Sequence, residues 1–307
     1  MTVHLRSYQP ADLARLLETL GAWNAATGGC GLLHPGDVVH GMANGLRGRD
    51  PANFYQLAED ERGNLLGMAM VYRPSLAGFD VCVAPDQRGS PAEQALVDWA
   101  EARAWAVMQA ANVAIETVNS DVMDCDPVRR QLLEARGYRD TGPSHIHTNR
   151  SLRGALPDMP LPHGYTFSTA AEFGNPDAIG SCHASAFGSS WPPGTYAAVL
   201  ATPGFDASRE LLVIAPDGRP AAFTVWWPDP VSRIGLFEPV GCAAEFQRRG
   251  LTRALLFEGM RRMQAAGMTT AAVNHELPEE NAASAGLYAS IGFEARYTMF
   301  CHVKTMR

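Results

Sequence analysis

The fold is decided by the stretch Glu238-Pro239-Val240-Gly241-Cys242-Ala243-Ala244-Glu245-Phe246-Gln247-Arg248-Arg249-Gly250-Leu251-Thr252-Arg253. It predicts a strand as far as Cys242, then a short loop and a helix from about Gly250. The first amides of a helix have no acceptor inside the helix, and the helix dipole adds partial positive charge there. Gly250 permits close approach of a ligand to the backbone, and the neighbouring arginines add charge for phosphate groups. The stretch therefore predicts a pyrophosphate site, with a plain basic helix start as the alternative.

A second informative stretch is Asn281-Ala282-Ala283-Ser284-Ala285-Gly286-Leu287-Tyr288-Ala289-Ser290-Ile291-Gly292-Phe293. In a helix, Asn281 and Tyr288 lie two turns apart on one face. Together the two stretches resemble the acyl-CoA-binding motif Gln/Arg-x-x-Gly-x-Gly/Ala and the closing helix of the GNAT superfamily of N-acyltransferases. The sequence departs from the motif at its last position, where Thr252 replaces Gly or Ala. The resemblance covers Leu236–Phe293, with both motifs in the family's order and separation.

The resemblance implies an acyl-CoA donor, with acetyl-CoA as the first choice, and direct transfer to a small-molecule primary amine. It implies that a backbone amide near Val240–Cys242 polarises the thioester carbonyl and that the Tyr288 hydroxyl protonates the departing sulfur. In the family, the residue at the position of Asn281 contacts the pantetheine–pyrophosphate arm. A packed aromatic side chain is the alternative for Tyr288. The donor-binding residues that the resemblance implies are Val240, Gly241, Cys242, Gln247, Arg248, Arg249, Gly250, Leu251, Thr252, Arg253, Asn281 and Ser284.

A base that accepts the amine proton is also required. Glu238 lies two residues before Val240 on the same predicted strand, so alternation would place both side chains on one face. Glu238 is therefore the first candidate, acting directly or through water. A carboxylate that is solvated or paired with Arg233 is the alternative. His275 and Glu276, which follow the next strand, are the reserve candidates.

Other reactive side chains have simpler interpretations. Cys242 near the thioester would allow a covalent ping-pong route, but a small apolar strand residue is the simpler hypothesis. His145 and His147 lack a third ligand, so we expect no metal. The aromatic candidates for an acceptor pocket, each with a core position as the default, are Trp191, Trp226 and Trp227.

The same order of elements occurs twice along the chain. In the first half we expect strands at 3–6, 54–58, 65–72, 79–83 and 113–118, and helices at 10–23, 91–108 and 128–136. In the second half we expect strands at 165–167, 211–215, 221–227, 233–242, 270–274 and 296–303, and helices at 176–187, 250–266 and 281–291. The expected fold class is α+β, with two tandem GNAT-like domains, each a mixed, mostly antiparallel twisted sheet flanked by helices.

The proline-rich segment between the halves cannot form a helix or a central strand and predicts a linker. We expect a degenerate domain at 1–153, a linker at 154–163 and a catalytic domain at 164–307. A long surface loop inside one domain is the alternative for the segment.

The first copy of the motif has lost its chemical residues. Arg88 is retained, but Pro91 and Glu93 replace the expected glycines. Proline offers no N–H to a phosphate, and a carboxylate repels one. In the closing helix, Leu133 and Asp126 stand at the tyrosine and asparagine positions. We expect the first half to be a structural or substrate-shaping copy, and a domain that binds a different ligand is the alternative.

The composition excludes several classes of protein. The formal net charge of -7 argues against a nucleic-acid-binding surface. No apolar stretch approaches the length of a membrane span, so we expect no membrane partner. The six cysteines have no metal-ligand spacing, so a reduced, cytoplasmic location is the simplest interpretation. For assembly we expect a monomer or a homodimer.

The prediction from sequence is therefore an acetyl-CoA-dependent N-acetyltransferase. A non-catalytic acyl-CoA-binding, sensing or interaction protein is the alternative, against which the retention of Tyr288 argues. A tandem arrangement with one impaired copy also resembles the architecture of mycothiol synthase. Acetylation of that type is the further alternative.

Overall fold

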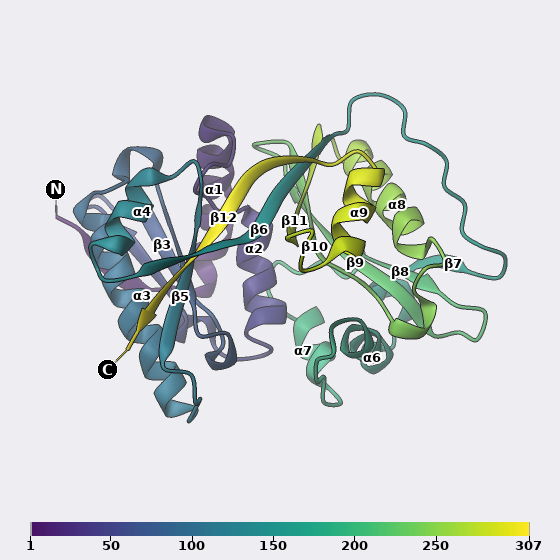
Figure 1. Ribbon diagram of the computed structural model, residues 1–307, viewed down its shortest axis with the longest axis horizontal. Coiled ribbons are helices and arrows are strands. Elements are labelled where there is room, and N and C mark those ends of the chain that lie inside the picture. Colours follow the sequence, from purple (N-terminus) through teal and green to yellow (C-terminus); the bar gives the residue numbers. More distant parts are fainter. Residues whose placement is uncertain (1, 307) are drawn as a thin grey trace. The chain divides into compact units, whose positions relative to one another are not determined.

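The computed structural model describes residues 2–306 and divides the chain into two compact units. Unit 1 comprises the residues up to His147 and those from Ala295 onward, and unit 2 comprises Thr148–Glu294 (Figure 1). Unit 1 has an antiparallel sheet and unit 2 a mixed, mostly antiparallel one, and helices flank both, which confirms the expected α+β class. No helix within residues 2–306 is long and apolar enough to cross a membrane.

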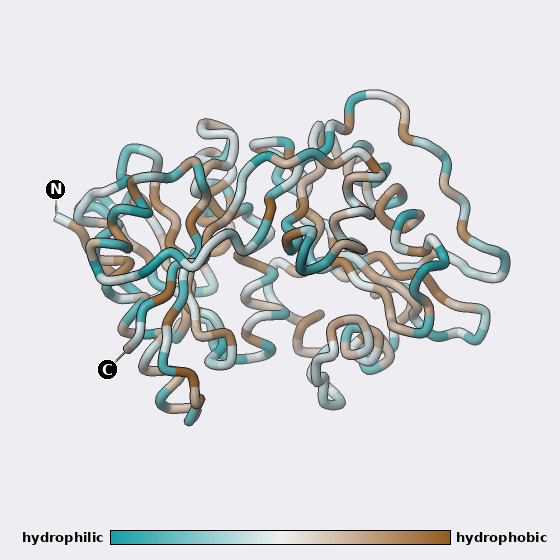
Figure 2. Tube along the Cα trace, viewed as in Figure 1, coloured by the Kyte–Doolittle hydropathy of each residue, from teal (hydrophilic) through white to brown (hydrophobic). Residues whose placement is uncertain are grey.

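Unit 1 is built on an antiparallel sheet in the order β1-β2-β3-β4. Helix α3 packs on β2, β3 and β4, and the interior is filled by side chains such as Leu57, Met68 and Leu96, which are fully buried. Figure 2 shows apolar residues mainly along such interior strands and hydrophilic residues at the turns. The helices and strands of unit 1 are β1 His4–Ser7, α1 Leu13–Thr27, α2 Pro35–His40, β2 Tyr55–Glu59, β3 Leu65–Val71, β4 Phe79–Val83, α3 Pro91–Ala110, β5 Thr117–Met123, α4 Pro127–Glu134 and β6 Arg139–Ser151. The last residues of β6 belong to unit 2.

The last strand of the chain, β12 (Glu294–Thr305), completes unit 1 rather than unit 2. It pairs antiparallel with β5, so that His302 lies opposite Ser120 and Phe300 opposite Val122. His302, Ser120 and Val122 are buried. We expected a strand at 296–303 to complete the second domain. In the structure this strand pairs with β5 of unit 1, a partner that is distant in sequence and that no local pattern indicates.

Strand β5 also differs from the expectation of a strand at 113–118. It spans Thr117–Met123, and alternate residues Val118, Ser120 and Val122 are buried. The interleaved polar residues face outward, so the strand is half-buried rather than continuously apolar. The expected linker segment contains no helix or strand and lies within unit 2, where Arg261 donates to Pro157 O at 2.9 Å.

A disulfide joins Cys30 and Cys125 in unit 1, with an S–S distance of 2.11 Å. We expected reduced cysteines, and for this pair the expectation is wrong. Cys30 follows α1 and Cys125 precedes α4, so the bond joins two loops that are far apart in sequence. Cys82, Cys182, Cys242 and Cys301 are free thiols.

Unit 2 contains the strand order β11-β10-β9-β8-β7, and the last residues of β6 lie beside β11. The expected hairpin at 216–219 is confirmed, since Ala215 N donates to Arg219 O at 2.9 Å between β8 and β9. The helices and strands of unit 2 are β7 Thr166–Thr169, α5 Ala170–Phe173, α6 Pro176–Phe187, α7 Thr195–Leu200, β8 Glu210–Ile214, β9 Pro220–Asp229, β10 Ile234–Cys242, α8 Leu251–Ala265, β11 Thr270–Glu276 and α9 Ala282–Ser290.

Helices α6 and α8 cover opposite faces of this sheet. The His183 ring of α6 stacks on Phe223 of β9, with ring centroids 3.5 Å apart. On α8, a Cβ at Gly259 would lie 2.5 Å from the Phe237 ring, so only glycine lets the helix approach so closely. Phe237 pairs with Trp226, which points to the face opposite Phe223. The sheet therefore has a core on each side.

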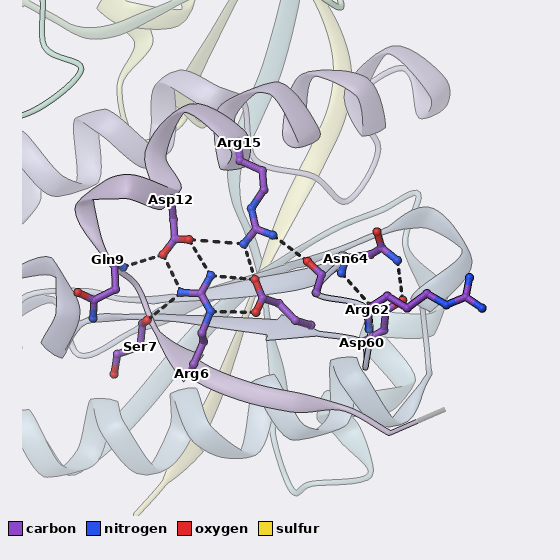
Figure 3. A network of polar contacts seen from close by, with 10 residues as sticks. Arg6, Ser7, Gln9, Asp12, Arg15, Asp60, Arg62 and Asn64 are labelled. Atoms are coloured by element: carbon purple, nitrogen blue, oxygen red, sulfur yellow. Dashed lines mark hydrogen bonds and ion pairs between the residues drawn. The ribbon is translucent and has the colours of Figure 1, made fainter.

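A polar network fixes the first strand of unit 1 (Figure 3). The Arg6 guanidinium pairs with Asp12 at 2.6 Å and with Glu59 at 2.8 Å, and Arg15 also binds Glu59. The Asp12 carboxylate accepts from Gln9 N at 2.8 Å. Hydrogen bonds from Arg6 are the main cause that lowers the pKa of both Asp12 and Glu59.

We expect this network to make unit 1 more stable at neutral than at acidic pH. Because the folded-state pKa values of Asp12 and Glu59 are depressed, their contribution is present above their unfolded pKa values and is lost as the pH falls through the folded ones. Arg6→Gln should cost about 1 kcal/mol at pH 7, since Arg6 is 36% exposed, and should flatten the acid dependence. Urea unfolding between pH 3 and 7 measures both effects. Arg62→Gln on the exposed hairpin is the control, and equal acid dependence in both variants would contradict the assignment.

Candidate functional site

The strands β10 and β11 separate in the middle of unit 2. They pair in parallel from Ile234 opposite Thr270 to Leu236 opposite Ala272, where the register ends. Both strands continue, to Cys242 and Glu276 respectively. On its other edge β10 stays paired with β9 as far as Cys242. Beyond Leu236 the facing edges of the two strands are not paired with each other in this register, so we expect their backbone N–H and C=O groups to be open to a ligand.

A β-bulge lies at the point where the strands separate. Phe237 pairs with Trp226, but the next paired residue, Val240, lies opposite Thr224, so Glu238 and Pro239 together oppose one residue. The Glu238–Pro239 peptide bond is cis. The expected alternation of Glu238 and Val240 on one face is wrong, because the extra residue breaks the period of two. The register instead places Val240 on the face of Phe237 and Glu238 on the opposite face.

Gly241 lets the β10 backbone lie close to the Phe223 ring. A Cβ at this position would lie 2.3 Å from the Phe223 ring, so no other residue fits without a shift. Phe223 is in turn stacked on His183. The His183 Nε2 lies 3.2 Å from Glu210 Oε1, and the Tyr196 hydroxyl donates to the same oxygen at 2.5 Å. Sequence reasoning missed this buried network, since its members come from three separate elements without a motif.

The loop after β10 leads into the exposed start of α8. It contains a 3-10 turn, Ala244–Phe246, and two residues with left-handed backbone, Arg248 with φ 61° and Gly250 with φ 76°. Gly250 is the N-cap of α8 and has no side chain with which to cap it. Ala254 N is the first amide that bonds back along the helix, to Gly250 O at 3.1 Å. Within residues 2–306, the backbone N–H groups of Leu251, Thr252 and Arg253 have no hydrogen-bond acceptor. These N–H groups can therefore donate to an anion.

The side chains around this helix start have different surroundings. Arg249 donates to the Tyr165 hydroxyl at 2.8 Å and to Glu245 O at 3.1 Å. Arg253 donates to Ser290 Oγ at 2.6 Å, and Gln247 donates to Cys242 O at 3.4 Å. Arg248 is exposed. Leu251 is 1% exposed, so it belongs to the core and offers a ligand its amide alone.

Asn281 caps α9. Its Oδ1 accepts from Ser284 N at 3.0 Å and its Nδ2 donates to Glu276 Oε2 at 2.5 Å. The cap explains why an asparagine precedes this helix. A contact to the donor arm stays a prediction for both Asn281 and Ser284.

Tyr288 lies on α9 with its ring 5% exposed. It stacks on the His275 ring, with centroids 5.2 Å apart, and meets Phe293 edge-on at 5.7 Å. Burial raises the pKa of Tyr288 above its ordinary value, and the carboxylates of Glu238 and Glu276 raise it further. Tyr288 is therefore a neutral phenol at physiological pH, in the electrostatic field of the candidate base.

Cys242 and two of the tryptophans fit their simpler interpretations, and His275 stays a reserve candidate for the base. Burial raises the pKa of Cys242, so it is a thiol rather than a thiolate at neutral pH. Trp226 and Trp227 are 8% and 3% exposed and belong to the core. His275 is buried, and its Nδ1 lies 2.7 Å from Glu276 O. A carbonyl oxygen only accepts, so Nδ1 carries the proton and Nε2 is the basic nitrogen.

In unit 1 the equivalent helix start is occupied by the chain itself. Ser90 caps α3 through its Oγ, which accepts from Ala92 N at 3.1 Å. The Glu93 carboxylate accepts from Gly89 N and from Arg129 Nε, the latter at 2.5 Å. Arg129 and Glu93 are 6% and 0% exposed, so this is a buried ion pair. In unit 1 the Ser90 hydroxyl therefore caps the first helix amides, and the Glu93 carboxylate binds the amide of the loop just before them.

The loop after α1 closes the same region of unit 1. Arg88, the retained residue of the motif, donates to Cys30 O, and Cys30 is held by its disulfide to Cys125. A Cβ at Gly31 would lie 2.4 Å from Asp126 Oδ2, so the loop lies directly on the residue at the asparagine position. Glu93 and this loop fit the expected loss of the first donor site, which stays a prediction.

The comparisons with known proteins concern one segment of the sequence and the overall fold. Residues 177–293 match the model of the acetyltransferase (GNAT) family. No curated protein sequence matches the chain. A GCN5-related N-acetyltransferase from Sphaerobacter thermophilus is similar in structure, with a TM-score of 0.64, 22% identity, and 99% of this chain and 96% of that chain covered.

A tandem GNAT protein from the clavulanic acid biosynthesis pathway also has a TM-score of 0.64, at 15% identity, covering 99% of this chain and 98% of its own. A putative acetyltransferase from Pyrococcus horikoshii has a TM-score of 0.55 at 12% identity, covering 99% and 90%. These likenesses concern the fold. They span both units, in agreement with the predicted tandem arrangement.

Proposed function

We propose that this chain, whose residues 177–293 match the GNAT acetyltransferase family, transfers an acetyl group from acetyl-CoA to a primary amine of a small molecule. The observation that carries the proposal is the opening between β10 and β11 beside the uncapped start of α8. The open strand edges suit the amide-rich pantetheine arm, and the helix start suits its pyrophosphate. Two of the similar proteins are named as acetyltransferases, which supports the same reaction.

The proposed chemistry is direct transfer within unit 2. A neutral amine attacks the thioester carbonyl, a C–N bond forms, and the C–S bond breaks. A β10 amide near Val240–Cys242 donates to the carbonyl oxygen as negative charge develops there. Tyr288 gives its proton to the departing thiolate, and Glu238 takes the proton from the amine, directly or through water. Because its pKa is raised, Tyr288 carries its proton at neutral pH when the reaction begins.

The donor should bind once per chain, in unit 2. Calorimetric titration with acetyl-CoA should give a stoichiometry near one, because Glu93 and the Cys30 loop fill the equivalent region of unit 1. Gly250→Val should weaken binding at least tenfold, about 1.4 kcal/mol, since a branched side chain at φ 76° distorts the loop and projects into open space before the helix. Gly267→Val is the matched control, with φ 85° and open space at the other end of α8. A stoichiometry near two would refute the loss of the donor site in unit 1, and equal affinity in the two variants would refute the donor site at Gly250.

Catalysis is tested separately by release of CoA thiol with a panel of small-molecule amines. Release that depends on both an amine and Gly250 supports the transferase. Donor binding without release from any amine would favour an acyl-CoA-binding protein.

A further inference from the structure

A cavity lies in unit 1 between β4 and β5. The chain segments of these strands meet at a parallel bridge between Gly78 and Asn119, and beyond it β4 and β5 belong to different sheets. The space between them has a volume of about 40 Å³. Because roughly 10–15 Å³ of such space holds one water molecule, the cavity has room for a small ligand group. It lies where two parallel neighbours separate, as β10 and β11 do in unit 2.

Part of the cavity wall is apolar and held in place by a covalent bond. The apolar residues of the wall include Leu32 from the loop after α1, Met123 from β5 and Met299 from β12. The disulfide between Cys30 and Cys125 joins the loop after α1 to the segment between β5 and α4. Both of these segments line the cavity, so its walls are preformed.

Two carboxylates of the wall have neutral partners. The Tyr72 hydroxyl donates to Asp80 Oδ2, and the Ser144 hydroxyl donates to Asp121 Oδ1 at 3.1 Å. Within residues 2–306, no ion pair joins Asp80 or Asp121 to a cationic side chain. Burial is the main cause that raises the pKa of Asp80 to about 6, and the charge of Asp121 acts in the same direction. Asp80 is therefore mostly ionised at neutral pH, although part of its hydration is lost.

The other charged residues of the wall are paired within the protein. Asp126 Oδ1 accepts from Arg129 N at 3.1 Å as the cap of α4, and Arg88 Nε lies 3.7 Å from Asp126 Oδ2. The Arg129 guanidinium pairs with Glu93 at 2.5 Å. Each of these two ion pairs is neutral overall. The cavity therefore keeps the negative charge of Asp80 and Asp121, which a cationic ligand would stabilise.

We propose that this cavity binds the ammonium group of a small alkylamine. Asp80 and Asp121 supply the opposite charge, and Leu32, Met123 and Met299 supply apolar contacts for the carbon chain. Within residues 2–306, no three His, Cys, Asp or Glu side chains are grouped so as to hold a metal ion, so the acids suit an organic cation better. The same acids would repel the phosphates of acyl-CoA.

The first copy is then a unit that binds an amine in place of an acyl-CoA donor. This inference concerns unit 1 and does not rest on the proposed function, which concerns unit 2.

The test adds n-butylammonium chloride to the full chain without acyl-CoA and follows binding by calorimetry and by the melting temperature. n-Butanol is the control that has the carbon chain without the charge. Sodium chloride at equal ionic strength is the control that has a positive charge without the chain. We expect n-butylammonium to bind and to raise the melting temperature beyond both controls. A response no larger than that to either control would overturn the proposal.

Variants locate the site. Asp80→Asn and Asp121→Asn should each weaken the binding of n-butylammonium about tenfold, as expected for loss of one charged partner. Asparagine keeps the shape and can still accept from Tyr72 or Ser144, so the ligand-free melting temperature should be unchanged or higher. Asp86→Asn, at an exposed aspartate of the same unit, is the matched control.

Glu238→Gln separates this site from amine binding in unit 2, and it should leave the response to n-butylammonium unchanged. The proposal fails if Asp80→Asn and Asp121→Asn both bind like Asp86→Asn, or if the response is lost in Glu238→Gln instead. Absence of CoA thiol release would count against the transferase and not against this site.

Discussion

Tyr288→Phe should lower kcat about 10²–10⁴-fold while leaving the affinity for acetyl-CoA nearly unchanged. The substitution removes one hydroxyl and keeps the ring, so the stacking on His275 and the contact with Phe293 should survive. The thiolate then leaves without a proton donor. Because burial and two carboxylates raise the pKa of Tyr288, the wild-type phenol stays protonated across the assay range. The defect should therefore not shrink as the pH rises.

Steady-state kinetics measures kcat, and calorimetric titration measures the affinity for acetyl-CoA. Tyr297→Phe, which removes a hydroxyl from unit 1, is the control and should retain wild-type turnover. A Tyr288→Phe enzyme with wild-type kcat would assign the tyrosine to packing. Loss of donor binding together with turnover would point to a collapsed site instead, and the melting temperature would show it.

Glu238→Gln should produce a large defect in kcat at neutral pH that shrinks as the pH rises. Below its pKa of about 10, an alkylamine acceptor is protonated and needs a base. At higher pH more of the amine is already neutral, so the missing carboxylate matters less. At pH 7 we expect a loss of about 10²-fold, within the range for a general base. The pH profile of kcat/KM for variant and wild type, with one amine, measures it.

Two further variants distinguish the candidates for the base. Glu276→Gln removes the other carboxylate that acts on Tyr288, and His275→Asn removes the imidazole stacked on it. If Glu238→Gln has wild-type rates at neutral pH, the role of general base would be assigned to Glu276 or His275. A similar defect in all three, without any change with pH, would indicate a structural role for each.

Local signals predicted much of unit 2 from the sequence. The helix at 176–187 and the hairpin at 216–219 form as expected, since an N-cap asparagine and a Pro-Asp-Gly turn act over a few residues. The start of α8 at Leu251 also follows from Gly250. These features depend on neighbours in sequence and need no tertiary contact.

Other features depend on contacts that no local pattern reveals. The bulge at Glu238 and Pro239 is defined by the register with β9, which the strand's own residues do not fix. The bond between Cys30 and Cys125 joins scattered cysteines without recognisable spacing. Glu93 was recognised as unfavourable for a phosphate, but its pairing with Arg129 required the fold. The roles of Tyr288, Glu238 and the donor-binding residues stay predictions.

The position of β12 has a consequence for the order of folding. Unit 1 begins with the first strands of the chain, yet its pairing of β5 with β12 needs residues as late as Thr305. During synthesis the strands of unit 2 leave the ribosome before unit 1 can be completed. Contacts of such high sequence separation are formed late and slowly, because a long loop must close first. Unit 1 should therefore mature after unit 2, with the edge of β5 exposed to wrong pairing or to chaperones in the interval.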